Sequence, residues 1–139
     1  MTAVDTNVLL DIVDGTQAEA TAAIALLAGA VPPLVISPAV FSELCAHRDW
    51  QLPDVRNFLL NAGIVVAWEL SEAIWAAAGE SFARHAERRR RSRNDRPRRI
   101  ATDFIIGAHA DSLGALVTRD DAFFRRNFPS LRIVGASVR

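Results

Sequence analysis

The sequence contains one cysteine, Cys45, and neither lysine nor tyrosine. A lone thiol excludes an intrachain disulfide and a cysteine-built structural zinc site. Long hydrophobic runs are also absent, because the longest uncharged apolar stretch, residues 22–36, contains Gly29 and Pro32-Pro33. That stretch is shorter than the ~20 residues that a membrane-spanning helix needs. The first residues show no basic segment followed by an apolar one, so no secretory signal is visible. We expect a soluble, cytoplasmic protein that does not act at a membrane.

Because lysine is absent, sixteen arginines balance sixteen acidic residues, and the formal net charge is zero. This balance conceals an uneven distribution. The segment 84–99 contains nine arginines and only two acidic residues, Glu87 and Asp95. It therefore carries an excess of about seven positive charges, and the rest of the chain carries the opposite excess. One part of the protein can attract a polyanion, while acidic clusters elsewhere can hold cations.

The 139 residues, half of them apolar, suit one domain with a packed core. We expect residues 1–139 to form a single domain that carries the arginine-rich segment 84–99. Short apolar runs alternate with helical patterns, which favours an α/β fold with a parallel sheet covered on both faces. The expected strands are 2–4, 34–36, 64–67, 116–117 and 131–134, and the expected helices are 8–13, 16–28, 38–45, 54–61, 71 into the arginine segment, 99–112 and 121–126. The Asn94–Pro97 sequence is expected to break the long helix.

Four acidic positions are candidates for a common site. Asp5 follows the first expected strand and Asp120 follows the fourth, where ligands bind in open parallel sheets. Glu43 and Asp103 lie on helices among apolar residues, where an unpaired carboxylate is costly. Other interpretations exist for each: Asp5, Asp120 or the neighbouring Asp121 could cap a helix, and Glu43 or Asp103 could face solvent.

A cluster of these carboxylates would require a cation. Two carboxylates about 4 Å apart repel each other by ~4 kcal/mol at an effective dielectric constant of 20. Such a group is tolerated when some members are protonated or when a cation lies among them. Sites that offer only oxygen ligands favour Mg²⁺ or Mn²⁺ over zinc. A divalent cation held in this way is suited to chemistry on phosphates.

Four sequence blocks resemble the motifs of PIN-domain ribonucleases, in particular the VapC-type toxins of bacterial toxin–antitoxin pairs. They occur in the family's order and span almost the whole chain. Their acidic residues are Asp5, Glu43, Asp103 and Asp120, because the Thr-x-Asp spacing of the last block selects Asp120 over Asp121. The blocks are residues 4–11 (VDTNVLLD), 37–44 (SPAVFSEL), 103–110 (DFIIGAHA) and 116–123 (LVTRDDAF).

This resemblance implies a PIN-like three-layer sandwich with a five-stranded, mainly parallel sheet flanked by helices. It implies that Asp5, Glu43, Asp103 and Asp120 are both catalytic residues and ligands of Mg²⁺ or Mn²⁺, with Glu43 binding directly or through water. Thr118 would orient a carboxylate through its hydroxyl. The reaction would be hydrolysis of a phosphodiester bond in RNA. The implied partners are an RNA substrate, a cognate antitoxin protein and a second copy of the chain in a homodimer.

The remaining polar and aromatic residues are interpreted more simply. Arg98 and Arg99 precede the helix of Asp103 and are predicted to bind RNA, although the arginine segment could equally face solvent or dock an acidic partner. The three histidines are interpreted as structural, Cys45 as a small core residue, and the three tryptophans as core or interface residues.

Two other functions are compatible with parts of the pattern. A non-catalytic PIN-like module could bind RNA through its arginines, but degenerate members of the family usually lose some of the acids. A phosphatase-like hydrolase also opens with an aspartate at a strand end. It would need an Asp-x-Asp opening and a nearby lysine, and this chain has Asp5-Thr6-Asn7 and no lysine.

Overall fold

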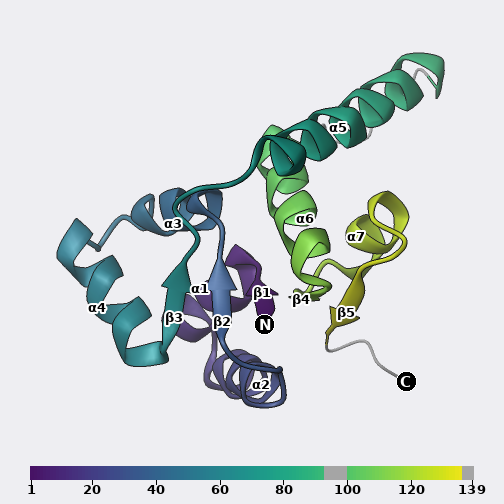
Figure 1. Cartoon of the computed structure of the whole chain (residues 1–139). Coiled ribbons are helices and arrows are strands. Elements are labelled where there is room, and N and C mark those ends of the chain that lie inside the picture. Colours follow the sequence, from purple (N-terminus) through teal and green to yellow (C-terminus); the bar gives the residue numbers. More distant parts are fainter. Residues whose placement is uncertain (93–99, 136–139) are drawn as a thin grey trace.

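The computed structural model describes residues 1–92 and 100–135. Within them, five parallel strands form one sheet in the order β3-β2-β1-β4-β5 (Figure 1). The strands are β1 (Thr2–Val4), β2 (Leu34–Ile36), β3 (Ile64–Val66), β4 (Ala115–Val117) and β5 (Arg132–Val134). The predicted α/β class and the predicted parallel sheet are confirmed.

Helices connect the strands and flank the sheet (Figure 1). They are α1 (Thr6–Asp14), α2 (Gln17–Ala28), α3 (Pro38–Cys45), α4 (Leu52–Ala62), α5 (Glu72–Ser92), α6 (Ala101–Leu113) and α7 (Asp121–Asn127). In Figure 1, the end of α5 that carries the arginines extends away from the sheet. The predicted break at 94–97 and the predicted helix start at Arg99 lie outside the described residues.

Local sequence signals explain most helix ends. The Thr16 hydroxyl accepts a hydrogen bond from the Glu19 amide at 3.1 Å, and the Glu19 carboxylate accepts one from the Thr16 amide at 2.9 Å, which completes a capping box. Ser37 caps α3, with Pro38 in its first turn. Helix α4 begins at Leu52, two residues before the expected Asp54, because the Asp54 carboxylate accepts a hydrogen bond from the Gln51 amide at 2.7 Å and so helps to cap the helix start.

The topology places the ends of β1 and β4 side by side. β1 is central, and its successor in the chain, β2, lies on one side, whereas β4 lies on the other. The sheet therefore reverses its order between β1 and β4, which is where ligands bind in doubly wound folds. Val4 is in register with Val117, and the Asp5 amide donates to the Val117 carbonyl at 2.9 Å. Asp5 and Thr118 consequently leave the sheet next to each other.

An aromatic cluster joins α5, α6 and α7. The Phe104 ring on α6 lies 5.1 Å from that of Phe82 on α5 and 5.2 Å from that of Phe123 on α7. Phe104 is fully buried. On the same helix, a side chain at Gly107 would overlap the ring of Phe128, so α6 needs a residue without a Cβ there. These contacts fix the helix of Asp103 against both neighbouring helices.

The structure tests the predicted positions of the cysteine and of the three tryptophans. Cys45 is exposed, so its assignment to the core was wrong: it is the last residue of the short helix α3, whose core-facing positions are Val40 and Leu44. Trp50 packs on the core, whereas Trp68 and Trp75 are at least half exposed.

Among the described residues, no helix has the length and apolar character needed to cross a membrane.

Candidate metal-binding active site

Asp5 lies at the centre of the polar residues beyond β1 and β4. The residue is 7 % exposed. One oxygen, Oδ1, accepts a hydrogen bond from the Thr6 amide at 2.7 Å, and the other, Oδ2, accepts one from the Thr118 hydroxyl at 2.7 Å. Asp5 occupies the N-cap position of α1, so the capping interpretation is confirmed, and its role in a metal site stays a prediction. Both oxygens are held in place by fixed donors.

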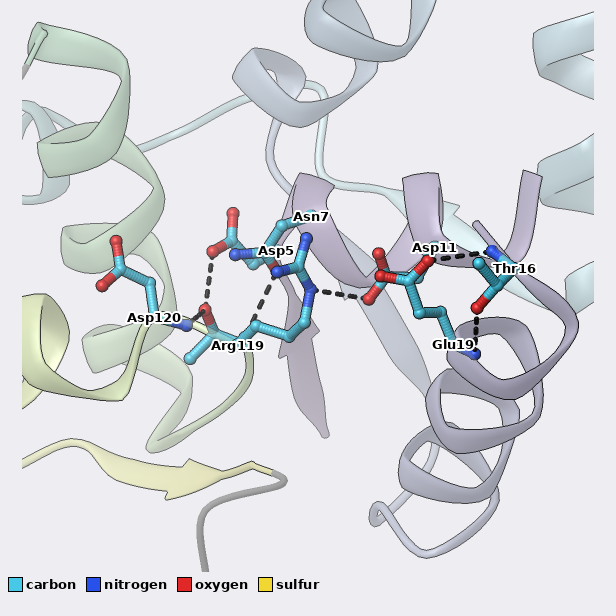
Figure 2. A network of polar contacts seen from close by, with 8 residues as sticks. Asp5, Asn7, Asp11, Thr16, Glu19, Arg119 and Asp120 are labelled. Atoms are coloured by element: carbon cyan, nitrogen blue, oxygen red, sulfur yellow. Dashed lines mark hydrogen bonds and ion pairs between the residues drawn. The ribbon is translucent and has the colours of Figure 1, made fainter. Parts of the chain in front are cut away.

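Thr118 connects Asp5 to Asp120. Its hydroxyl donates to Asp5 and accepts a hydrogen bond from the Asp120 amide at 2.9 Å. Thr118 is fully buried. The predicted role of its hydroxyl in orienting a carboxylate is therefore confirmed. Asp120 precedes α7 but does not cap it through its side chain, whereas Asp121 pairs with Arg125 of α7 at 3.8 Å. Figure 2 shows Asp5 and Asp120 on adjoining segments, with Arg119, which precedes Asp120 in the chain, close to both.

Glu43 joins this group through Thr6. The Thr6 hydroxyl donates a hydrogen bond to Glu43 Oε1. Thr6 belongs to the first turn of α1, and Glu43 belongs to α3, which packs against α1. This contact was not predicted from the sequence. The contact connects the first two acidic blocks of the sequence.

Asp103 completes the acidic surroundings of Asp5. Burial raises the pKa of Asp5 from 3.8 to about 6, the hydrogen bonds from Thr118 and Thr6 oppose that rise, and the negative charges of Asp103 and Glu43 add to it. The structure therefore brings Asp5, Glu43 and Asp103 close enough for their charges to interact. A buried carboxylate beside two others is an arrangement that a cation relieves.

Among the described residues, no group of three or more histidine, cysteine, aspartate or glutamate side chains stands in an arrangement that could hold a metal ion. The four acids share a region of the fold without forming a closed ligand set. The donors are all carboxylate oxygens, the kind that Mg²⁺ and Mn²⁺ prefer, so the residues fit such an ion in kind. Metal ligation by these four residues stays a prediction.

Arg119 ties the loop of Asp120 to α1. Its guanidinium pairs with Asp11 at 2.6 Å, and its amide donates to Asn7 Oδ1 at 3.3 Å (Figure 2). Asn7 and Asp11 are four residues apart on α1 and thus share one face. Arg119 also lowers the pKa of Glu19, although less than the Thr16 hydrogen bonds do. The sequence analysis missed this contact; the i,i+4 spacing of Asn7 and Asp11 was its only sequence signal.

Arg98 and Arg99, the predicted RNA-binding residues, lie outside the described residues. Their role stays a prediction. The described part of the arginine segment belongs to α5, where Glu87 pairs with Arg90 at 2.6 Å and with Arg91 at 3.2 Å. His109 is buried within α6, as expected for a structural histidine.

The arrangement of an aspartate after β1, a glutamate on α3, an aspartate on α6 and a Thr-x-Asp after β4 agrees with a family comparison. The family model described as the PIN domain matches residues 2–129. The chain belongs to the PIN-domain family. A comparison with curated proteins found no match.

Several solved structures share this PIN-domain fold. The chain is similar to the FitAB complex bound to an IR36 DNA fragment, with a TM-score of 0.68, 15 % identity, and coverage of 97 % of this chain and 94 % of that one. It is also similar to VapBC-1 from nontypeable Haemophilus influenzae, with a TM-score of 0.60, 19 % identity and 95 % coverage of both chains. For a toxin–antitoxin complex from Klebsiella pneumoniae the TM-score is 0.59 and the identity 20 %, over 94 % of this chain and 95 % of that one. At these identities the likeness establishes the fold.

Proposed function

We propose that the chain is a divalent-metal-dependent endoribonuclease and the toxin of a VapBC-type toxin–antitoxin pair. The observation that carries the proposal is the position of Asp5. It is buried where the sheet order reverses, and the charges of Glu43 and Asp103 act on it. This arrangement destabilises the chain unless a cation neutralises it, so it is best explained by metal binding.

In the proposed mechanism, Asp5, Asp103 and Asp120 hold Mg²⁺ or Mn²⁺, and Glu43 contributes directly or through water. A bound divalent cation would polarise the phosphate and lower the pKa of a bound water. The Thr118 hydroxyl keeps Asp5 Oδ2 in place, and the Thr118–Asp120 hydrogen bond sets the start of α7. Thr6 occupies Glu43 Oε1, which leaves Oε2 to accept a hydrogen bond from the attacking water. Hydrolysis would leave a 5′-phosphate and a 3′-hydroxyl.

The proposed partner is a small antitoxin protein. Its support is the similarity of this fold to chains in toxin–antitoxin complexes, two of them described as bound to DNA. The proposed homodimer and the cytoplasmic location rest on the family resemblance alone. Co-expression with the product of an adjacent small reading frame, followed by co-purification, would test the partner.

The function is tested by incubating total cellular RNA with the purified chain in Mg²⁺, in Mn²⁺ and in EDTA, beside the Asp5→Asn variant. Discrete fragments that require both the metal and Asp5 are expected. If the folded chain, freed of antitoxin, produces no fragments in any condition, the nuclease proposal is contradicted and a non-catalytic RNA-binding module becomes the better explanation.

A further inference from the structure

Three arginines on α5 and α7, Arg84, Arg88 and Arg126, lie near enough for the charges of Arg84 and Arg126 to act on Arg88. Arg88 of α5 donates a hydrogen bond through Nη2 to Asn127 Oδ1 of α7 at 2.9 Å. Arg84 lies one helical turn before Arg88 on the same face of α5, and Arg126 directly precedes Asn127. The positions of the three side chains are therefore set by two helices that Phe104 holds together.

These three arginines form no ion pair with any described residue. By contrast, Arg90 and Arg91 elsewhere on α5 both form ion pairs with Glu87. The pKa of Arg88 is lowered by its burial and then by the positive charges of Arg126 and Arg84. A cluster of like charges that lacks an acidic partner in the described part of the chain, in a protein with as many acidic as basic residues, indicates an external anion.

We propose that Arg84, Arg88 and Arg126 bind a backbone phosphate of an RNA strand, away from the bond that is cut. This inference rests on the proposed nuclease function, because that function supplies the RNA. Arg126 follows Asp120 by six residues, or about 9 Å along the axis of α7. A strand whose scissile phosphate lies at the carboxylates can therefore place a neighbouring phosphate at this arginine cluster. Guanidinium groups bind phosphate through paired hydrogen bonds, and such contacts position a strand without reading its sequence.

The test compares two double variants that remove the same charge. Arg84→Gln/Arg126→Gln removes two members of the cluster and keeps the Arg88–Asn127 hydrogen bond. Arg90→Gln/Arg91→Gln removes two exposed arginines that are paired with Glu87 on the same helix. Binding of a labelled oligouridylate to the full-length proteins is measured by fluorescence anisotropy in EDTA over a series of salt concentrations. A homopolymer is suitable because phosphate contacts are independent of sequence.

The Arg84→Gln/Arg126→Gln variant is expected to bind at least about tenfold more weakly. Its plot of log K against log salt should be flatter by up to about 0.7, since the loss of one single-strand phosphate contact contributes ~0.7. The control should bind within about twofold of the wild type, because its arginines already have a partner. Equal losses of RNA affinity in the two variants would overturn the proposal. Unchanged RNA affinity in Arg84→Gln/Arg126→Gln would also overturn it and would assign the cluster to an acidic protein partner.

Cleavage kinetics separate this inference from the proposed function. A phosphate contact away from the reacting bond should raise KM and leave kcat unchanged in Arg84→Gln/Arg126→Gln. If Arg84→Gln/Arg126→Gln cleaves and binds RNA as the wild type does, the phosphate site is overturned and the proposed nuclease function is unaffected. Loss of binding in that variant, in a chain that cleaves no RNA, supports the phosphate site and overturns the nuclease.

Discussion

Thr118 donates a hydrogen bond to Asp5 across 113 positions of the chain, at 2.7 Å and away from solvent. The same hydroxyl accepts a hydrogen bond from the Asp120 amide at 2.9 Å. One buried oxygen atom therefore sets the relative positions of the first and last acidic blocks. This is possible because β1 and β4 are hydrogen-bonded neighbours in the sheet although they lie at opposite ends of the sequence.

Replacing Thr118 by valine should remove this connection with little change in volume. We expect RNA cleavage to fall about 10- to 100-fold, as is typical when a group that orients a metal ligand is lost. The buried Asp5 oxygen and the Asp120 amide would each lose a partner, so the free energy of unfolding should fall by about 1–3 kcal/mol. Thr118→Ser keeps the hydroxyl and should retain most activity. Equal cleavage by the valine and serine variants would remove the hydroxyl from the mechanism.

Arg119→Gln tests the tie between the Asp120 loop and α1. The guanidinium is about half exposed, so its pairing with Asp11 should contribute less than ~1 kcal/mol to stability. Because the pair holds a loop next to the acidic residues, we expect a several-fold drop in cleavage with almost no change in Tm. Arg125→Gln, which removes an exposed arginine from the adjoining α7, serves as the control. If Arg119→Gln has the same cleavage rate and the same Tm as the wild type, the Arg119–Asp11 ion pair has no role in the reaction.

Asp103→Asn should abolish RNA cleavage and leave the fold intact, because Asp103 would serve as a metal ligand and is not needed for packing. The matched control is Asp111→Asn, which makes the same change at an exposed position of the same helix. Circular dichroism should show the same helix content in both variants. Cleavage by purified Asp103→Asn at the wild-type rate would exclude Asp103 from the reaction.

His109 should make the protein less stable in mild acid. Burial lowers its pKa below the ordinary 6.5, so the folded chain resists protonation that the unfolded chain accepts. Below a pH of about 6.5 the unfolded state binds more protons at this histidine, so the contribution of His109 to the free energy of unfolding falls with falling pH until the lower, folded-state pKa is passed. Asp5, whose pKa is raised to about 6, acts in the opposite direction and is the same in the wild type and the His109 variant. Urea unfolding at several pH values, beside His109→Gln, measures this slope. The glutamine variant should show a flatter profile; identical profiles would mean that another group titrates.

Local signals in the sequence were sufficient for the order and type of the elements. The helix starts at Thr16 and at Ser37-Pro38 and the short apolar runs each depend on neighbouring residues, and each appears in the structure. The acidic positions came from four blocks that resemble a family, because spacing alone leaves capping and solvent exposure open for Asp5 and Glu43.

Contacts between distant residues could not be predicted in the same way. The Arg119–Asp11 pair and the Arg88–Asn127 hydrogen bond depend on strand register and on how helices pack, which no local pattern records. The exposed position of Cys45 could not be predicted from a local pattern either. A helix of eight residues has barely two turns, so its periodicity does not decide on which side its last residue lies.

The central claim, that Asp5 and its acidic neighbours bind a divalent cation, is tested most directly by titrating Mn²⁺ into the purified chain and following binding by calorimetry. Asp5→Asn is the test variant and Asp111→Asn the control. We predict that Mn²⁺ binds the wild type and Asp111→Asn with the same affinity, and that binding is lost in Asp5→Asn while its thermal unfolding stays cooperative. Mn²⁺ binding of equal strength to a folded Asp5→Asn variant would contradict the claim.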